Sequence, residues 1–274
     1  MNRLFVVNKP MFVSSNFYLN RIKKKYKVKK AGFSGTLDPF AKGCLIIAFG
    51  QYTKLFQFLK KTPKRYKATL FLGAYSETLD IEKISYVEKI DSFQITKIEK
   101  ILNSFKGKIK QIPPKYSAKK IDGIRAYSLA RDGKNLNIPE IEIEIFNIKL
   151  LNYSHPFLSF EVEVSEGTYI RSLGRDIAEK LGTYGSLSYL ERLNEGEFKF
   201  ENERSLNPLD FLNLKENFYL NDIKNLELGR KLNKKDFQIK ENGRYFVKFN
   251  NYFAIIELLD NEVKYLLNKV ELCL

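Results

Sequence analysis

The chain has 274 residues, 44% of them hydrophobic, which is enough apolar material for one sizeable core and a small second domain. Its net charge of +15 favours a polyanionic partner, RNA or DNA before a membrane surface, although part of the lysine excess reflects a composition also rich in Asn, Ile and Phe. The single histidine and the two distant cysteines argue against Ser-His-Asp or Cys-His catalysis and an ordinary zinc site, which leaves a carboxylate enzyme or a binding protein.

The first predicted elements are a strand and a basic helix. LFVVNK (4–9) predicts a short strand that Pro10 ends, because proline lacks the N–H donor. Ser14 or Ser15 then offers an N-cap for a helix that carries RIKKKYKVKK (21–30). This run of cations is most simply a solvated helix face, and it also suits an edge that contacts phosphates.

The next segments predict a strand and then a helix. KRYKATLFLGAYSETLD (64–80) is typical of a strand that enters a polar loop. TKIEKILNSFKG (96–107) predicts a helix with a capping box of Thr96 and Glu99 and with Gly107 at C′.

A polar loop over 111–134, with a short helix around Ala126–Arg131, leads to two segments of alternating polarity. These segments, 141–151 and 158–167, predict adjacent half-buried strands that pair antiparallel. The stretch 167–182 then predicts an amphipathic helix that its last glycine ends.

The composition changes from about Asn213, where short apolar runs alternate with Asn and Gly. Hairpin signals at Asn250-Asn251 and Asp260-Asn261 favour a small β-domain. We therefore expect two domains, 1–212 and 213–274. The N-terminus shows no secretory signal and the longest apolar run, CLIIAF, is too short to span a bilayer, so we expect a soluble cytoplasmic protein.

The candidate chemistry centres on GFSGTLDP (32–39). Pro39 pushes Asp38 out of the helical region, so its carboxylate should project from a turn. Gly35 lets the backbone approach a bulky group or simply fold tightly. Taken alone, the motif is most simply a turn that Asp38 caps.

Other residues add to this motif. Tyr66 and Tyr116 stand among cations, a combination that binds unstacked bases. Arg171 lies near a helix N-terminus, where a guanidinium can pair with a carboxylate or a phosphate. An ion pair with Glu166 or Asp176 is the simpler alternative for this arginine.

Together these segments resemble the TruB-type tRNA pseudouridine synthase family. GFSGTLDPFAKGCLIIAFGQYTK is similar to the family's catalytic motif, and the likeness is collinear over most of the first two hundred residues. The other matching segments are NKP (8–10), KRYKATLFLG (64–73) with the loop 78–80, QIPPKYSAKKIDGIRAYSLAR (111–131), EGTYIRSL (166–173) and LERLNEGEF (190–198).

The resemblance implies a role for each matching residue. It makes Asp38 the essential catalytic aspartate, Tyr66 the ring that packs on the target base, and Arg171 the partner of Asp38. It places Leu190 in the base pocket and makes Lys9 a structural support. The other expected site residues are Phe33, where the family usually has histidine, and Tyr169 for substrate binding, with Gly35, Pro39, Asp80 and Tyr116 in support.

The family chemistry sets further requirements. The C1′–N1 bond of a flipped-out uridine must break, the uracil must turn, and C5 must bond to C1′ with water excluded. A carboxylate can attack C1′ or remove the C2′ proton, and both routes stay open. The apolar pocket that this requires would be lined by Phe33, Leu37, Phe40, Tyr66 and Leu190.

The resemblance also implies the fold and the substrate. We expect an α+β fold with a mixed, largely antiparallel sheet flanked by helices, followed by a PUA-like β-domain or a non-binding cap. We expect isomerisation of uridine 55 in the tRNA T-loop without cofactor or metal, by a monomer that contacts the T-arm and elbow and needs neither a membrane nor a protein partner. The alternatives are a synthase acting on another RNA, including a guide-dependent one, and a tRNA-binding folding factor with weak or no catalysis.

Overall fold

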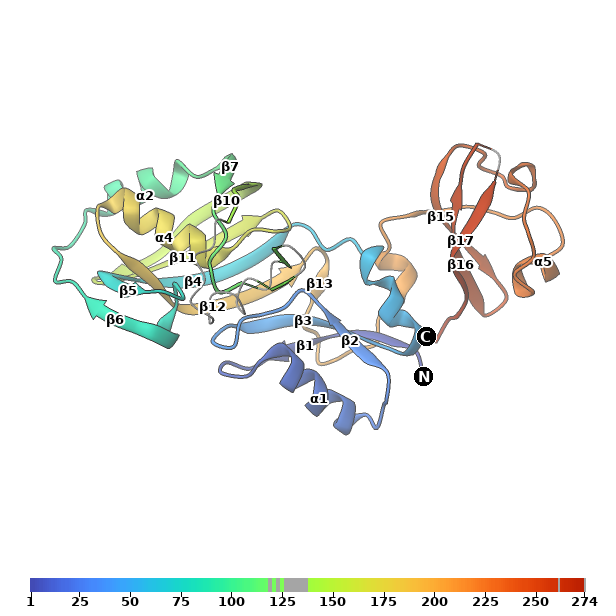
Figure 1. Ribbon diagram of the computed structural model, residues 1–274, viewed down its shortest axis with the longest axis horizontal. Helices are drawn as coiled ribbons and strands as arrows, with labels where there is room; N and C mark the ends of the chain where they lie inside the picture. Colours follow the sequence, from blue (N-terminus) through green and yellow to red (C-terminus); the bar gives the residue numbers. More distant parts are fainter. Residues whose placement is uncertain (118–119, 122–123, 126–137, 261, 274) are drawn as a thin grey trace.

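The main feature of the computed structural model, which describes residues 1–117, 120–121, 124–125, 138–260 and 262–273, is a large twisted sheet (Figure 1). In these residues nine strands form it, in the order β1-β3-β12-β4-β11-β10-β7, with β2 beside β3 and β13 beside β12. The strands are β1 (Arg3–Lys9), β2 (Ala31–Ser34), β3 (Lys42–Phe49), β4 (Lys64–Leu72), β7 (Gly107–Gln111), β10 (Ile141–Ser154), β11 (Phe157–Val164), β12 (Gly185–Glu195) and β13 (Phe198–Lys199).

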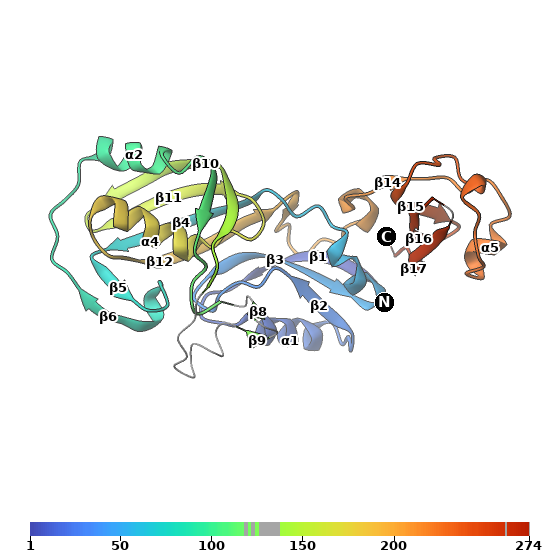
Figure 2. The ribbon, with the colours of Figure 1, turned by 45° about the horizontal axis from the view of Figure 1, so that its top comes forward.

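The sheet is mixed but largely antiparallel, which confirms the expected fold class. Its parallel contact is short and joins β12 to β3, where Glu191 pairs with Lys42 and Arg192 with Gly43. This contact connects the smaller β1-β3-β2 part to the larger β12-β4-β11-β10-β7 part (Figure 2). The antiparallel pairing of β10 with β11, expected from their alternating polarity, is also confirmed.

Helices cover the two parts of the sheet separately (Figure 1). Two of them, α2 (Ile95–Asn103) and α4 (Ile170–Leu181), pack on the larger part through a shared apolar core. The helix α1 (Ser15–Lys25) packs on the smaller part through Leu19 and Ile22. None of the helices in the described part of the chain is long and apolar enough to cross a membrane.

A second sheet lies near the C-terminus, with strands in the order β14-β15-β16-β17. Its strands are β14 (Lys215–Glu216), β15 (Gly243–Phe249), β16 (Tyr252–Leu258) and β17 (Val263–Glu271), with α5 (Lys224–Glu227) beside them. The remaining short elements are η1 (Gly50–Gln57), η2 (Ile81–Lys83), η3 (Pro208–Phe211), η4 (Lys234–Asp236), β5 (Ala74–Ser76), β6 (Ile84–Val87), β8 (Lys120–Ile121) and β9 (Ile124–Arg125).

The predicted C-terminal end of the first helix is wrong. The basic helix α1 ends at Lys25 instead of continuing to residue 30, because the chain turns through Lys27 at φ +53°. This turn brings the Tyr26 ring within 5.6 Å of Phe5 and 5.5 Å of Phe49, between ring centroids, on the sheet. The N-cap of this helix is Ser14, one of the two serines expected.

The predicted capping box of α2 is also wrong. The N-cap is Gln94, two residues before Thr96, because Ile98 N–H donates to the Gln94 carbonyl and the helix begins at Ile95. Thr96 therefore lies inside the helix, and Gly107 begins β7 instead of ending the helix. By contrast, Gly182 ends α4 in the left-handed conformation as expected.

Two expectations fall partly or wholly outside the described residues. The short helix expected around Ala126–Arg131 lies there, as does Asn261 of the second hairpin signal. The first hairpin signal, Asn250-Asn251, is confirmed as the turn between β15 and β16.

Candidate active site

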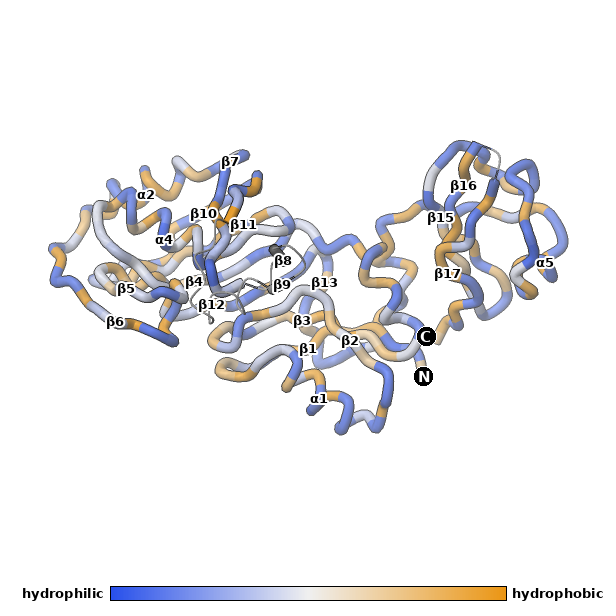
Figure 3. The backbone as a smooth tube through the Cα atoms, viewed as in Figure 1, coloured by the Kyte–Doolittle hydropathy of each residue, from blue (hydrophilic) through white to orange (hydrophobic). Residues whose placement is uncertain are grey.

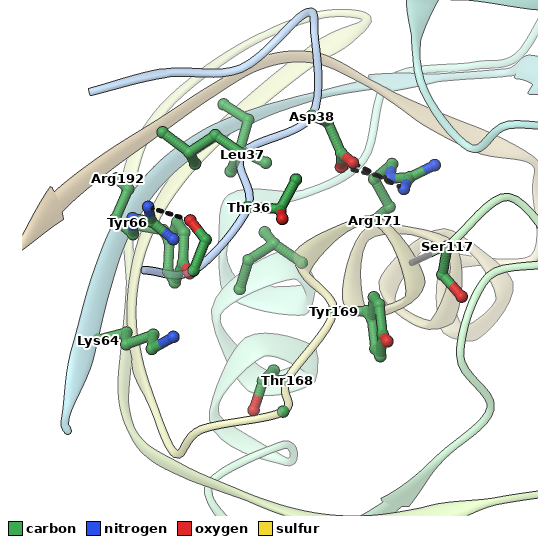
Figure 4. A pocket seen from close by; sticks show the side chains of 14 residues that line it. Thr36, Leu37, Asp38, Lys64, Tyr66, Ser117, Thr168, Tyr169, Arg171 and Arg192 are labelled. Atoms are coloured by element: carbon green, nitrogen blue, oxygen red, sulfur yellow. Dashed lines mark hydrogen bonds and ion pairs between the residues drawn. The ribbon is translucent and has the colours of Figure 1, made fainter. Parts of the chain in front are cut away.

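A cavity of about 320 Å³ lies where the loop after β2 meets β4, β12 and the start of α4 (Figure 4). The loop supplies Asp38 and α4 supplies Arg171, which point toward each other on one side. Lys64, Tyr66 and Arg192 stand on the other side of the view. The residues that line the cavity are Gly35, Thr36, Leu37, Asp38, Lys64, Tyr66, Ser117, Gly167, Thr168, Tyr169, Ile170, Arg171, Leu190 and Arg192.

Asp38 and Arg171 form a two-bond ion pair. Arg171 Nε lies 2.8 Å from Asp38 Oδ2, and Arg171 Nη2 donates to Asp38 Oδ1 at 3.1 Å. The guanidinium is 5% exposed and the carboxylate 35%, so the arginine is fixed in the protein while the carboxylate still faces the cavity. This fork geometry holds the carboxylate in one orientation.

The rest of the Arg171 guanidinium is held by the protein interior. It donates to the carbonyls of Thr78 at 2.7 Å and Tyr116 at 2.9 Å, and Nη1 lies 3.5 Å from Asp80 Oδ2. Burial raises the pKa of Asp80, while hydrogen bonds from Thr78 Oγ1 at 2.6 Å and Glu82 N–H at 3.0 Å favour its charged form. Asp80 is thus a buried carboxylate that helps fix Arg171 in place.

The loop that carries Asp38 is held from below by two side chains. Ser15 Oγ accepts from Leu37 N–H at 3.0 Å and donates to the Leu37 carbonyl at 2.9 Å. Lys9 Nζ donates to the carbonyls of Val13 at 2.7 Å and Pro39 at 3.4 Å, and also to that of Pro10. Burial lowers the pKa of Lys9 to about 8, although the Asp38 charge acts in the opposite direction.

A buried group of charges supports the opposite wall. Arg192 Nη2 lies 2.8 Å from Glu195 Oε1 and donates to the Gly35 carbonyl at 2.7 Å, and Lys64 Nζ lies 3.3 Å from Glu195 Oε2. Gly35 has φ +67°, and a Cβ there would come within 2.8 Å of the Glu195 carboxylate. The left-handed turn and the close approach both require glycine at this position.

The apolar part of the wall comes from adjacent strands. Tyr66 on β4 and Leu190 on β12 are 7% and 4% exposed, and their strands pair directly. Leu37 and Ile170 add aliphatic surface from the loop and from α4. Burial raises the pKa of Tyr169, which keeps its phenol neutral at the cavity wall.

A second, wider cavity of about 840 Å³ lies on the other side of the ion pair. It shares Thr36, Leu37, Asp38, Ser117 and Arg171 with the first cavity, so the pair stands between the two spaces. Its remaining lining residues are Ser14, Ser15, Asn16, Phe33, Pro39, Thr78, Asp80, Glu82, Lys83 and Tyr116.

The structure therefore gathers most of the expected site residues around Asp38. The expected residues that line the first cavity are Gly35, Asp38, Tyr66, Tyr169, Arg171 and Leu190. Those that line the second are Phe33, Asp38, Pro39, Asp80, Tyr116 and Arg171. Lys9 lines neither cavity and lies beneath the loop. Phe40 also lines neither, because its side chain is fully buried in the core of the larger part of the sheet.

The simpler alternative for Arg171 is wrong, because Asp176 pairs with Arg175 at 2.6 Å and Glu166 lies nearest Lys61 at 3.7 Å. Several site residues were missed: Ser15, Lys64, Thr78, Arg192 and Glu195. A cation beside an aromatic in KRYKA was a signal for Lys64, whereas no sequence pattern placed Ser15 against Leu37. Among the described residues, no group of three or more His, Cys, Asp or Glu side chains is placed to hold a metal ion.

Comparisons with known proteins identify relatives over the whole chain. Residues 23–170 match the model of the TruB family pseudouridylate synthase (N terminal domain). The chain is 54% identical over 270 residues, 98% of each chain, to a tRNA pseudouridine synthase B of Sulfurovum sp.. It is 51% identical over 273 residues, the full length of both chains, to the protein of the same name from Campylobacter jejuni.

Solved structures show a similar fold. A chain in the crystal structure of a Cbf5-Nop10-Gar1 complex superposes with a TM-score of 0.70 at 20% identity, over 98% of this chain and 84% of that one. A chain in an H/ACA RNP bound to a substrate RNA containing 2′-deoxyuridine gives a TM-score of 0.66 at 19% identity, over 99% and 85% of the two chains.

Proposed function

The chain belongs to the TruB family of pseudouridylate synthases, and from that premise we propose that it converts uridine 55 in the T-loop of tRNA to pseudouridine. The observation that carries the proposal is the Asp38 carboxylate, fixed by a buried Arg171 at the wall of a small, half-apolar cavity. The full-length relatives named tRNA pseudouridine synthase B support tRNA as the substrate.

The cavity suits a single flipped-out uracil. A base removed from its stack needs an aromatic or apolar surface to replace that stack, and Tyr66 and Leu190 provide one. Their aliphatic and aromatic surface also excludes water, which would otherwise hydrolyse the reactive intermediate and leave an abasic site.

Asp38 acts on the ribose of that nucleotide. It either attacks C1′ or removes the C2′ proton, and in both routes the C1′–N1 bond breaks and its electrons leave with N1 of the uracil. The uracil then turns in the cavity and C5 bonds to C1′. In the first route this bond displaces the Asp38 carboxylate from C1′, and in the second route Asp38 returns its proton to C2′. The proton on C5 is finally lost to solvent and N1 takes one up, so the product is an isomer of the substrate and no cofactor is consumed.

Arg171 is a positioning residue for this carboxylate. Its two bonds to Asp38 fix the direction of the reacting oxygen, and its bonds to the Thr78 and Tyr116 carbonyls fix the guanidinium itself. A reacting oxygen that is held in place avoids the entropy loss of finding its position in each turnover.

The charge of the chain supports a tRNA partner. The net charge of +15 attracts phosphates, and the last turn of α1 contributes Lys23, Lys24 and Lys25 to it. We propose that the protein contacts the T-arm and elbow as a cytoplasmic monomer without an obligatory protein partner, and that residues 1–212 carry the catalysis.

Tritium release tests the proposed function. Purified protein is incubated with T-arm RNA that carries tritium at C5 of its uridines, because forming the C5–C1′ bond expels that hydrogen. We expect release by the wild type, and a loss of at least about a hundredfold in Asp38→Asn, which keeps the shape of the side chain but removes its charge.

Binding measurements on the same two proteins complete the test. We expect Asp38→Asn to keep its affinity for the RNA and its thermal stability, so that its loss of turnover concerns chemistry. RNA binding by both proteins with no release by either would overturn the proposal and favour the RNA-folding factor.

A further inference from the structure

Phe12 lies in the connection between β1 and α1, in a conformation that does not favour phenylalanine. Its φ is +61°, in the left-handed region where a side chain is strained and glycine is preferred. Its side chain is 69% exposed, so burial of the ring contributes little free energy to offset this strain. The connection around it is coloured as hydrophobic in Figure 3. Since neither the backbone nor burial accounts for the ring, the strain points to a function.

A second exposed ring lies close by in the chain. Phe17, in the first turn of α1, is 53% exposed, and the Arg21 guanidinium lies 4.8 Å from its ring centroid. An exposed aromatic ring with an arginine over one face is a surface that nucleic-acid bases stack on.

The residues between these two rings line the wider cavity. Ser14, Ser15 and Asn16 form one edge of it, and the same cavity reaches Asp38. On the other side, α1 continues with lysines through its last turn. Phe12 and Phe17 thus flank, along the chain, the segment 14–16 that lines the wider cavity next to Asp38.

We propose that Phe12 and Phe17 form a stacking surface for the unpaired nucleotides next to the target uridine. The inference rests on the proposed function, because those nucleotides enter the wider cavity only when the uridine is held at Asp38. The wider cavity then holds the flanking bases, the rings cover them, and the lysines of α1 contact the backbone phosphates. In this proposal the backbone strain at Phe12 is retained because the exposed ring stacks on a base of the bound RNA.

Phe12→Gly tests this directly, because glycine adopts φ +61° without strain. We expect the midpoint of thermal unfolding to stay close to that of the wild type while Kd for T-arm RNA rises about tenfold. Phe12→Leu, which keeps apolar surface but no ring, should lose nearly as much affinity, and Phe12→Tyr should keep most of it.

The base that stacks is identified with RNAs that lack the base 5′ or 3′ of the target uridine. The wild-type protein should bind one of these RNAs more weakly than intact RNA. The Phe12→Gly variant, which has already lost the ring, should bind that RNA and intact RNA with nearly equal affinity. Phe146→Ala, which removes a 46% exposed ring on β10, serves as the control and should bind normally.

An unchanged Kd in Phe12→Gly overturns the inference, as does an equal loss in Phe146→Ala. Tritium release by the wild type is measured in parallel, and its absence would overturn the proposed function instead. The two failures are distinct, because Kd reports the stacking surface whether or not turnover occurs.

Discussion

The candidate active site depends, at the scale of single residues, on buried cations that bind backbone carbonyls. Arg171 joins α4 to the carbonyls of Thr78 and Tyr116, and Arg192 joins β12 to those of Gly35 and Cys44. A side chain that binds carbonyls of two segments fixes their separation, which a simple ion pair does not. These cations therefore set the shape of the cavity as well as its charge.

Lys9 has the same role beneath the Asp38 loop, and its charge should make stability depend on pH. Its pKa is lowered by burial to about 8 in the folded chain, against 10.5 in the unfolded chain. Between these values the unfolded chain binds more protons, so the free energy of unfolding contains a part that rises with pH. We expect this part to add about 1–2 kcal/mol between pH 7 and pH 9.5.

Urea unfolding of the wild type and of Lys9→Met at several pH values from 7 to 9.5 measures this effect. The methionine side chain does not titrate, so the difference in unfolding free energy between the two proteins should shift in favour of the wild type as pH rises. A difference that stays constant across that range would mean that Lys9 keeps an ordinary pKa in the folded chain.

The Asp38 loop is the decisive element, because segments far apart in the chain hold it. Helix α1 holds Leu37 through Ser15, β1 holds Pro39 through Lys9, and β12 holds Gly35 through Arg192. The loop has no regular secondary structure, so its conformation depends on the hydrogen bonds from these three side chains.

Ser15→Ala should therefore lower turnover without a large change in KM. It leaves the buried Leu37 N–H without its partner, which costs about 1–3 kcal/mol, and lets the loop shift. A small displacement of a catalytic group lowers kcat about ten- to a hundredfold. Steady-state tritium release gives kcat and KM separately.

Ser14→Ala is the matched control for this helix. Ser14 caps α1 by accepting from Phe17 N–H and has no bond to the Asp38 loop. Its loss should cost about 1 kcal/mol of stability. Because Ser14 lines the wider cavity, any effect on the substrate should appear in KM, while kcat stays near the wild-type value. Equal kcat in the two variants would show that Ser15 acts on the helix alone.

The sequence predicted elements and residue types better than their connections. Alternating polarity predicted β10 and β11 because that signal is local. The GTLDP motif alone indicated a turn, and Asp38 became the catalytic candidate only through the resemblance over several distant segments. The end of α1 was missed because Tyr26 packs on a sheet that no local pattern describes. The Glu195–Lys64 pair was missed because it depends on the pairing of β12 with β4.

At the scale of the whole molecule, we propose that the expected boundary between residues 212 and 213 does not separate two units of stability. One apolar cluster joins Tyr52 and Leu55 of η1 to Phe253 and Leu267 of the C-terminal sheet. Cys273 N–H also donates to Tyr52 Oη at 3.1 Å. Removing the C-terminal segment would therefore expose core side chains of the first part.

The C-terminal sheet also has its own cluster on its other face, around Phe237. Alternate residues of β15 and β16 serve the two clusters, so that Phe246 and Ile255 face the shared one while Val247 and Ile256 face the other. Truncating a buried side chain on one face of this sheet should also weaken packing on the other face, because side chains of both faces are attached to the same strands. The two parts of the chain should therefore unfold together.

Phe237→Ala tests this coupling, because Phe237 is fully buried in the cluster that the first part of the chain does not share. We expect a loss of about 3–5 kcal/mol and a lower midpoint for one transition of the whole chain, with equal calorimetric and van't Hoff enthalpies. Leu220→Ala, in the same segment but 68% exposed, should leave the midpoint unchanged. A separate early transition, with the main one at its wild-type temperature, would instead show that residues 213–274 fold independently.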